Sequence, residues 1–439
     1  MKIRIIDDLV PEDVAMLQAL YSRSPASVDD HRRKVEEVGS GKFMGEFYVG
    51  YNHASIGDCG STTIFIEGVS MLMAKAVQDN PLYSGQEAST RYMDFSNATF
   101  DSPGASSIDG RLIQRDWMQF YHHAYDIMLA HFREMYPYVP EQNARPGDDK
   151  KYDRALKARV FDVVRGFIPA GTHTNLSWHT NLRQARDKLR WLVAHPESQI
   201  AHAASELLGR LHVQYQSSGF DSKMSEEEWK WRRDVMDVFA YTFEDPGPVP
   251  LLSFRNFRWP NDEKMRKVLH SRPANVALPP IFGKLGTIES TFRLDFGSFR
   301  DLQRHRNGFV QMPLLTTKIG FNDWYYAQMP DGLRAEAKQF VAAQVERIEA
   351  LRVTDVERQS YIAMGFDVGC RVVQTLPAFV YRVELRTAQT VHPTLRRIAQ
   401  AEARLFTDQT GGVVQMHVDL SPDIWSTRRG AQTIEARPR

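Results

Sequence analysis

The sequence predicts an α+β fold made of two similar domains, each with a sheet packed against helices. The chain has 439 residues, and single domains mostly fall between about 100 and 200 residues. A β-rich run passes directly into a helical one at 62–77, and the same order returns at 291–315. Between them, the segment 244–262 holds four prolines and several aromatic residues. We therefore predict a repeated architecture with domains at 1–240 and 241–439.

The first half contains three helical or mixed segments that follow from residue spacing. Pro11 opens a short helix with EDVAMLQALY (12–21), because proline is favoured in the first turn. After the β-to-helix run at 62–77, apolar residues three and four positions apart predict an amphipathic helix; these are Ile113, Trp117, Phe120, Ala124 and Ile127. GFIPAG (166–171) then precedes a stretch that leads into an arginine-rich helix at 172–192.

The second half is predicted to repeat this order. TFRLDFGSFRDLQRHRNGFVQMPLL (291–315) takes the place of the first β-rich stretch, and TLPAF (375–379) is aligned with FIPAG. A helix between them has one apolar face, formed by Leu333, Ala337, Val341, Val345 and Ile348. The segment 383–406 supplies the final helix with arginines.

Composition excludes several classes of function. Lys plus Arg number 55 and Asp plus Glu 54, so no net charge draws the chain to a nucleic-acid polymer or to an anionic membrane. Only Cys59 and Cys370 occur, which fits a reducing compartment. No apolar run approaches the length of a membrane span or signal peptide. We expect a cytoplasmic protein.

The stretch GQEASTRYMDF (85–95) gathers groups that bind anions. On an extended segment, Ser89 and Arg91 point to one side, where a hydroxyl and a guanidinium can bind the same oxyanion. Glu87 falls on that side too, and its carboxylate requires a donor such as a sugar hydroxyl. The alternative is a surface strand with an ion pair between Glu and Arg.

A second basic group is RHR at 304–306. Two fixed positive charges around an imidazole suit a pyrophosphate or negative charge that develops in a reaction. The alternative is a solvated basic turn. Arg165, Arg183 and Arg186 add cations to such a site if they converge.

Two further groups of residues contain histidine: the first is a candidate binding site, and the second is not predicted to bind a metal. His53 and Ser55 can orient a ring or a phosphate, or form a turn that satisfies its own backbone. His173 and His179 lie six positions apart with no acidic or cysteine partner nearby, so no metal site is predicted. No GxGxxG, Walker loop or GxSxG elbow occurs, which removes support for the usual dinucleotide, nucleotide triphosphate and hydrolase folds.

Four motifs in register give the first half a family resemblance. HASIGDC (53–59) is similar to HxSxxEH, with Asp58 and Cys59 in place of Glu and His. IEGVS (66–70) matches directly, and SGQEASTRY (84–92) is similar to SxNExSxRY. VRGFIPAGTHTNLSWHTNLR (164–183) is similar to ARxxLPxxxxTxxxWxxNxR. Together these motifs, within about residues 45–195, resemble the flavin-dependent thymidylate synthases, the ThyX family.

The departures from this family are complementary between the halves. Asp79, Asn80 and Pro81 stand where the family has RHR, whereas the second half keeps RHR but lacks SxRY. In the family, four identical chains build each site; the RHR segment holds flavin and lends charge, and the SxRY segment holds the nucleotide. The resemblance therefore implies two tandem ThyX-like domains, with a chain dimer forming a pseudo-tetramer that retains half of the sites.

The implied activity is FAD-dependent reductive methylation of a uracil nucleotide, dUMP or UMP. Methylenetetrahydrofolate supplies the methylene group, reduced FAD the hydride and NADPH the reducing equivalents, and the protein is a homodimer. The resemblance assigns catalytic roles to Arg165, Arg304, Arg306 and Arg396. It assigns nucleotide binding to Ser84, Glu87, Ser89, Arg91, Tyr92, Arg183 and Arg386, and flavin binding to His53, Ser55, Arg304, His305 and Arg306.

Two alternatives use the same parts. A methylase of another pyrimidine nucleotide, in modified-nucleoside metabolism, is compatible with the altered motifs. A non-catalytic flavin or nucleotide binder that partners an active enzyme is the other, because a shared fold does not determine function.

Overall fold

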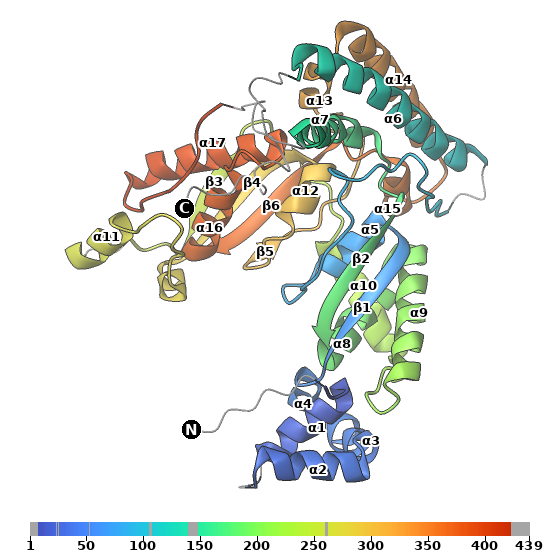
Figure 1. Cartoon of the computed structure of the whole chain (residues 1–439), viewed down its shortest axis with the longest axis vertical. Helices are drawn as coiled ribbons and strands as arrows, with labels where there is room; N and C mark the ends of the chain where they lie inside the picture. Colours follow the sequence, from blue (N-terminus) through green and yellow to red (C-terminus); the bar gives the residue numbers. More distant parts are fainter. Residues whose placement is uncertain are drawn as a thin grey trace. The chain divides into compact units, whose positions relative to one another are not determined.

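The computed structural model forms two compact units, shown with the chain coloured by sequence in Figure 1. The first unit takes residues 1–87 and 174–238, and the second takes 88–173 and 239–439. The break at Val238 lies near the domain boundary that the sequence predicts, whereas 88–173 groups with the second half of the chain. The structure describes residues 8–22, 24, 26–51, 53–104, 108–138, 148–259 and 262–422.

The first unit has a small sheet with helices before and after it. α1 (Pro11–Tyr21), α2 (Val28–Val38), α3 (Gly41–Phe43), a π-helix (Met44–Gly50) and α4 (Ser55–Asp58) precede the sheet. β1 (Ser61–Ser70) runs directly into α5 (Met71–Gln78), which confirms the predicted change from strand to helix. β2 (His173–Asn181) pairs with β1 and is followed by α8 (Leu182–Val193), α9 (Ser198–Gln214) and α10 (Glu226–Phe239). Bridges from Ser84 to His179 and from Glu87 to Leu176 add the segment 84–87 to β2.

The second unit is built on an antiparallel sheet of order β3-β4-β6-β5. Its strands are β3 (Leu251–Arg255), β4 (Thr287–Asp295), β5 (Phe309–Val310) and β6 (Asp367–Thr375). β3 falls inside the proline-rich segment 244–262, so this part of the chain is an edge of the sheet as well as the link between halves. Its helices are α6 (Ile108–Met135), α7 (Asp148–Val164), α11 (Glu263–His270), α12 (Phe296–Leu302), α13 (Asp323–Ala327), α14 (Asp331–Glu349), α15 (Asp355–Arg358), α16 (Leu376–Arg386) and α17 (Pro393–Thr410).

Two sets of apolar side chains hold the second unit together. Ile288 on β4, Phe379 on α16 and Phe406 on α17 lie in one buried cluster. Figure 1 shows α16 and α17 beside the sheet that contains β4. A second set joins α6 to α14, where the rings of Phe120 and Phe340 stack with centroids 4.3 Å apart. Both α6 and α14 cover the helices that apolar periodicity predicts. None of the helices within the described ranges combines the length and the apolarity needed to cross a bilayer.

Two segments far apart in sequence follow the same course and bind each other reciprocally. Each has a 3-10 turn (Arg165–Phe167 and Gln359–Tyr361), then a nine-residue strand, β2 or β6, that leads directly into a helix. Pro169 and Ala363 form an antiparallel bridge. The amide of Ala170 donates to the carbonyl of Ile362, and the amide of Met364 donates to that of Ile168, both at 2.9 Å. The contact therefore has local two-fold symmetry.

This symmetry corrects the alignment of TLPAF with FIPAG. The counterpart of FIPAG is YIAMG (361–365), because both follow a 3-10 turn and precede a strand. TLPAF instead begins α16, where Asn181 and Leu182 begin α8. The alignment was wrong because the prolines of the two segments serve different turns, one before a strand and one at a helix start. Arg386 and Arg396 were placed opposite the family's substrate arginines on that alignment, and they lose this support.

A second correspondence joins β1–α5 to β4–α12. Ser70 and Asp295 cap the two helices, and each side chain accepts a hydrogen bond from the amide three residues later. Ser84 and Phe309 follow their cap residues by the same number of positions, and both segments pair with the equivalent strands β2 and β6. In this register Asp79–Pro81 takes the place of RHR at 304–306, as the sequence indicates.

Candidate functional site

Two arginines lie near the carboxylate of Asp301 in the second unit, a third binds its main-chain carbonyl, and the charge of Arg91 also acts on it. We call these four arginines and Asp301 the arginine cluster. Arg304 Nε lies 3.7 Å and Arg165 Nη1 3.9 Å from the carboxylate oxygens. Arg386 Nη2 donates to the main-chain carbonyl of Asp301 at 2.6 Å. Burial by itself raises the pKa of Asp301. The positive charges of four arginines lower the pKa by more than burial raises it, so it lies well below its usual range; these are Arg91, Arg304, Arg165 and Arg386. Asp301 is therefore ionised at neutral pH.

The cluster draws its arginines from both halves of the sequence. Arg91 comes from the turn after segment 84–87, and Arg165 begins the 3-10 turn after α7. Asp301 lies in the last turn of α12, with Arg304 just beyond it, and Arg386 is the final residue of α16. Of the arginines predicted to add cations near RHR, Arg165 lies in this cluster, whereas Arg183 and Arg186 belong to the first unit.

The segment around Ser89 is not extended, which corrects one premise of the sequence analysis. The pairing with β2 reaches Glu87, after which the amides of Tyr92 and Met93 both donate to the carbonyl of Ser89. The hydroxyl of Ser89 accepts from the amide of Arg91 at 3.3 Å. Serine readily forms such local bonds and thereby favours a turn over a strand. Ser89 and Arg91 consequently do not share one side of a strand.

Arg91 is anchored by groups outside the cluster. Its Nε donates to Asp162 Oδ1 on α7 at 2.8 Å, and its Nη2 donates to the carbonyl of Thr390 at 3.4 Å. Asp162 is almost fully buried. The neighbouring Tyr92 is largely exposed. Arg91 is thus held in place before any ligand arrives.

Arg165 belongs to a buried polar network. Its Nη2 donates to the hydroxyl of Ser298 at 2.8 Å and lies 3.6 Å from the carboxylate of Asp295. Asp295 also accepts from the hydroxyl of Tyr325 at 2.8 Å. Burial lowers the pKa of Arg165, but Tyr325, Asp295 and Asp301 raise it above its usual value. Arg165 Nε is buried and has no hydrogen-bond partner within the described residues.

The three residues of RHR have different environments. The side chain of Arg304 is 45% exposed, and within the described part of the chain its guanidinium makes only the 3.7 Å contact to Asp301. His305 is buried, and its Nε2 accepts from Arg386 Nε at 2.7 Å. Burial and then Arg386 hold the pKa of His305 well below its usual value, so the ring is neutral and orients Arg386. Arg306 Nη1 donates to the carbonyl of Arg304 at 3.2 Å.

Several predicted site residues lie in the first unit. Glu87 forms an ion pair of 2.8 Å with Lys75, and the exposed fractions of the two side chains are 2% and 0%. Ser84 bridges His179 in the sheet. Arg183 pairs with Asp58 at 2.7 Å.

His53 and Ser55 also lie in the first unit. The ring centroid of His53 is 6.1 Å from that of Tyr51 and 6.4 Å from that of Phe47. Its Nδ1 is buried without a hydrogen-bond partner within the described ranges. Ser55 opens α4, and its carbonyl accepts from the thiol of Cys59.

Arg396 is in the second unit but is engaged elsewhere. Its Nε donates to the carbonyl of Thr387 at 2.7 Å, and its Nη2 donates to the carbonyl of Ser421 at 2.9 Å. It also pairs with Asp419 at 3.2 Å. These contacts give Arg396 a role in holding the segment after α17.

Sequence reasoning missed the carboxylates of the cluster. Asp301 precedes Arg304 by three residues, a spacing that places two helical side chains near each other, so a local signal existed. Asp295 had no such signal, because Arg165 is distant in sequence. Asp162 has a local partner in Arg159 at 3.9 Å, but its hydrogen-bonded partner Arg91 is distant. No group of three or more His, Cys, Asp or Glu residues suited to a metal is present within the described ranges.

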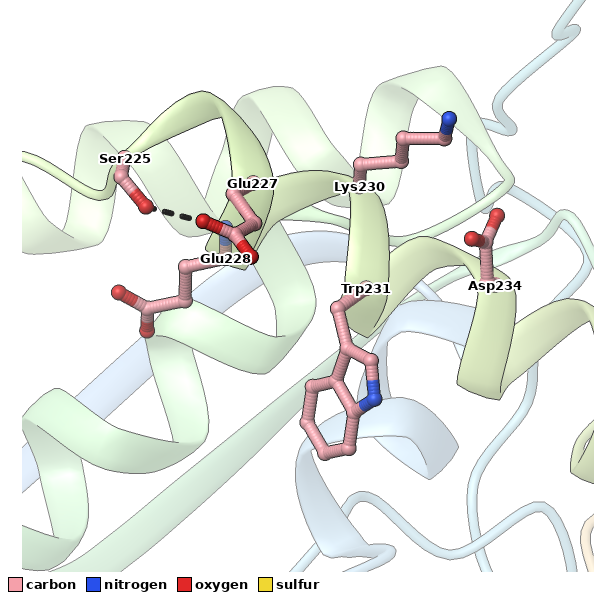
Figure 2. A pocket seen from close by; sticks show the side chains of 6 residues that line it. All are labelled: Ser225, Glu227, Glu228, Lys230, Trp231 and Asp234. Atoms are coloured by element: carbon pink, nitrogen blue, oxygen red, sulfur yellow. Dashed lines mark hydrogen bonds between the residues drawn. The ribbon is translucent and has the colours of Figure 1, made fainter.

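A surface hollow along α10 is separate from these predicted residues. Figure 2 shows its lining, in which the amide of Glu228 donates to the hydroxyl of Ser225. Glu228 also pairs with Arg190 and Arg232, so its charge is balanced within the first unit. The lining residues are Ser225, Glu227, Glu228, Lys230, Trp231 and Asp234.

Comparisons with known proteins find one family model and several distant relatives. Residues 5–213, just under half of the chain, match the model of the family described as thymidylate synthase complementing protein. The UPF0159 protein of Chlamydia muridarum is 24% identical over 421 residues, which cover 83% of this chain and 76% of the relative. The UPF0159 protein of Chlamydia pneumoniae is 22% identical over 80% of this chain and 75% of its own length. That of Thermoplasma acidophilum is 25% identical over 87% and 90%.

We expect Glu87→Gln to lower the stability of the protein. The change leaves the buried charge of Lys75 without its counter-charge, and breaking a buried ion pair costs about 3–5 kcal/mol. Thermal unfolding measures the effect. The matched control is Glu206→Gln, which removes an exposed ion pair with Arg210 and should change stability by less than about 1 kcal/mol. An unchanged midpoint together with weaker ligand binding would instead support the sugar-binding role predicted for Glu87.

We also expect stability to fall as the solution becomes acidic. Burial holds the pKa of His305 and His392 well below the usual value and lowers that of His195 to about 3. The unfolded chain therefore binds protons that the folded protein does not, and stability that is complete above about pH 6.5 is lost below it, by up to about 1.4 kcal/mol per pH unit for each histidine. Thermal midpoints measured from neutral to mildly acidic pH test this.

His305→Gln should flatten that pH dependence, because glutamine does not titrate and can still accept from Arg386. An equal slope in the variant and the original protein would contradict the assignment of a neutral, buried His305.

Proposed function

Through residues 5–213 the chain belongs, as a divergent member, to the thymidylate synthase complementing protein family, and we propose that it catalyses FAD-dependent reductive methylation of a uracil nucleotide. The observation that carries this proposal is the arginine cluster. Arg91 belongs to the motif that the first half keeps, and Arg304 to the motif that the second half keeps. Arg304 lies 3.7 Å from the carboxylate of Asp301, and the charge of Arg91 helps to lower the pKa of the same carboxyl.

A tandem duplication explains why the two motifs are complementary. The reciprocal hydrogen bonds between 168–170 and 362–364 relate the halves as two copies of one element would be related. Each copy then needs only part of the ancestral site, provided that the parts meet. We propose that two such chains associate as a homodimer equivalent to the family's tetramer, and that the retained sites number half of the ancestral ones.

The chemistry of the cluster fits phosphate ligands. Guanidinium groups bind phosphate oxygens through paired N–H donors, and the guanidinium of Arg304 donates no hydrogen bond within the described part of the chain. Arg91 is the residue we assign to the phosphate of the uracil nucleotide, and Arg304 to the pyrophosphate of FAD. A bound flavin would supply the hydride, with methylenetetrahydrofolate as the one-carbon donor and NADPH as the reductant.

Arg165 is suited to a different task. It is a buried cation with a fixed geometry, and its Nε has no partner within the described residues. A pre-oriented donor of this kind stabilises negative charge that develops on a pyrimidine carbonyl when the ring carbon becomes nucleophilic. We assign this role to Arg165 in preference to Arg396, whose guanidinium binds main-chain carbonyls.

One observation favours a second candidate, methylation of another pyrimidine nucleotide. Arg183 stands at a nucleotide-binding position of the family motif but forms a 2.7 Å ion pair with Asp58. Asp58 replaces the family's Glu. This pairing changes the donors available to a nucleotide, so the sugar or base that is accepted can differ from that of dUMP.

The decisive experiment is the visible absorption spectrum of the purified protein, followed by reduction and reoxidation with dUMP, UMP or neither present. A yellow protein whose reoxidation responds to one nucleotide supports a flavin enzyme and identifies the substrate class. A colourless protein that does not take up FAD would refute the proposal and favour a binding role.

Arg91→Ala should abolish nucleotide binding and leave flavin content unchanged, because a lost charge-assisted contact weakens binding by roughly 10- to 100-fold or more. Arg304→Ala should have the opposite pattern. Nucleotide affinity by calorimetry and flavin content by absorbance separate the two.

Arg91→Lys accompanies the first variant as a fold-preserving form, since it keeps a charge beside Asp162. Arg210→Ala, which removes an exposed arginine of α9, is the control for loss of a cation and should leave both readouts unchanged. Retained nucleotide affinity in Arg91→Ala would refute the assignment.

A further inference from the structure

The carboxylate of Asp301 meets its arginines differently from that of Asp162, the carboxylate that anchors Arg91. Asp162 accepts from Arg91 at 2.8 Å, a hydrogen-bonded ion pair. Asp301 instead lies 3.7 and 3.9 Å from its nearest guanidinium nitrogens, which is beyond hydrogen-bonding distance. Its carboxylate contributes charge to the cluster without a directional bond.

The arginines do not depend on this carboxylate for their positions. Arg91 is held by Asp162 and by the carbonyl of Thr390. Arg165 is held by the hydroxyl of Ser298. Arg386 is held by the ring of His305 and by the main-chain carbonyl of Asp301, which any side chain at this position would keep. Removing the negative charge of Asp301 therefore leaves three of the four cations anchored.

In the sequence, the acidic residue Asp301 occurs only in the half that has the RHR motif. Asp301 precedes RHR by three residues, and the corresponding position before Asp79–Pro81 in the first half is Ala76. The acid is thus present in the half that keeps the two arginines and absent from the half that lacks them. This distribution is what a residue that balances those charges would show.

We propose that Asp301 is an internal counter-ion that competes with the phosphoryl group of the ligand for the arginine cluster, and so limits the affinity for anions. The inference rests on the proposed function in taking the cluster as a phosphate site. Its side chain is 16% exposed, so an incoming anion can share the arginines with it. Arg91 and Arg165 keep Asp162 and Asp295 nearby without Asp301, but Arg304 would lose its carboxylate and the cluster would attract small polyanions more strongly. With Asp301 present, a ligand must supply further contacts, through its base, sugar or ring, to remain bound.

The alternative role, a clamp that positions the arginines, predicts the opposite result. If Asp301 held the guanidiniums together, its loss would let them separate and anion binding would weaken. If it competes, its loss raises the positive charge at fixed positions and anion binding becomes tighter. The sign of the change therefore distinguishes the two roles.

The test is calorimetric titration of the full chain with inorganic pyrophosphate. Asp301→Asn keeps the shape of the side chain and the main-chain carbonyl, and it should tighten pyrophosphate binding about tenfold, an effect that declines as salt is added. Asp245→Asn is the matched control: it removes the carboxylate that pairs with Arg293 and should leave the affinity unchanged. Asp162→Asn, which loosens Arg91, should weaken binding.

Equal or weaker pyrophosphate binding by Asp301→Asn would overturn the proposal, and so would a failure of both proteins to bind pyrophosphate. The result is independent of the activity. Tighter binding by the variant, in a protein that takes up neither FAD nor a uracil nucleotide, would refute the proposed function and leave the counter-ion role standing.

Discussion

The reciprocal backbone contact between residues 166–171 and 360–365 is the constraint on which the second unit depends. The amide of Gly171 donates to the carbonyl of Ser360, and the amide of Gly365 donates to that of Gly166. The backbones approach so closely that a Cβ on Gly171 would lie 2.7 Å from the Ser360 oxygen, and one on Gly365 would lie 2.8 Å from the Gly166 oxygen. Glycine is therefore needed at both symmetry-related positions. This contact carries Arg165, from the first half of the sequence, to the end of α12.

The strand-to-helix elements β1–α5 and β4–α12 each place a basic residue at the same position, but the two basic residues have different partners. Lys75 and Arg300 follow their helix caps, Ser70 and Asp295, by equal numbers of residues. In the first half, Lys75 meets Glu87, and the two buried charges neutralise each other. The position of Glu87 is taken in the second half by the buried Met312, and Arg300 donates to the hydroxyl of Thr90 at 3.3 Å. The first half thus closes on an internal ion pair, whereas the second half contributes to a cationic site.

The proposed chemistry requires guanidinium groups that are held in place and that still have N–H donors available to a ligand. Arg91, Arg165 and Arg386 are positioned by neighbours on α7, α12 and the segment around His305, which limits the reorganisation needed when charge develops. Arg304 keeps its donors for a ligand, since no described residue accepts from them. The carboxylate at the centre determines how strongly this set attracts an anion. Position and affinity are therefore set by different residues.

Several helices and strands, and the resemblance to the ThyX family, follow from the sequence alone. Strand-to-helix junctions, amphipathic helices such as α6 and α14, and the motifs within 5–213 are encoded in short windows, where hydrophobic period and spacing act directly. Three findings required the tertiary structure. Residues 88–173 pack with the second half of the chain, YIAMG (361–365) is the structural counterpart of FIPAG, and the backbone at Ser89 forms a turn and not a strand. The tertiary structure also decided that Asp301 lies beside Arg165 and Arg304. These outcomes depend on contacts between segments as much as 299 residues apart, for which local periodicity carries no signal.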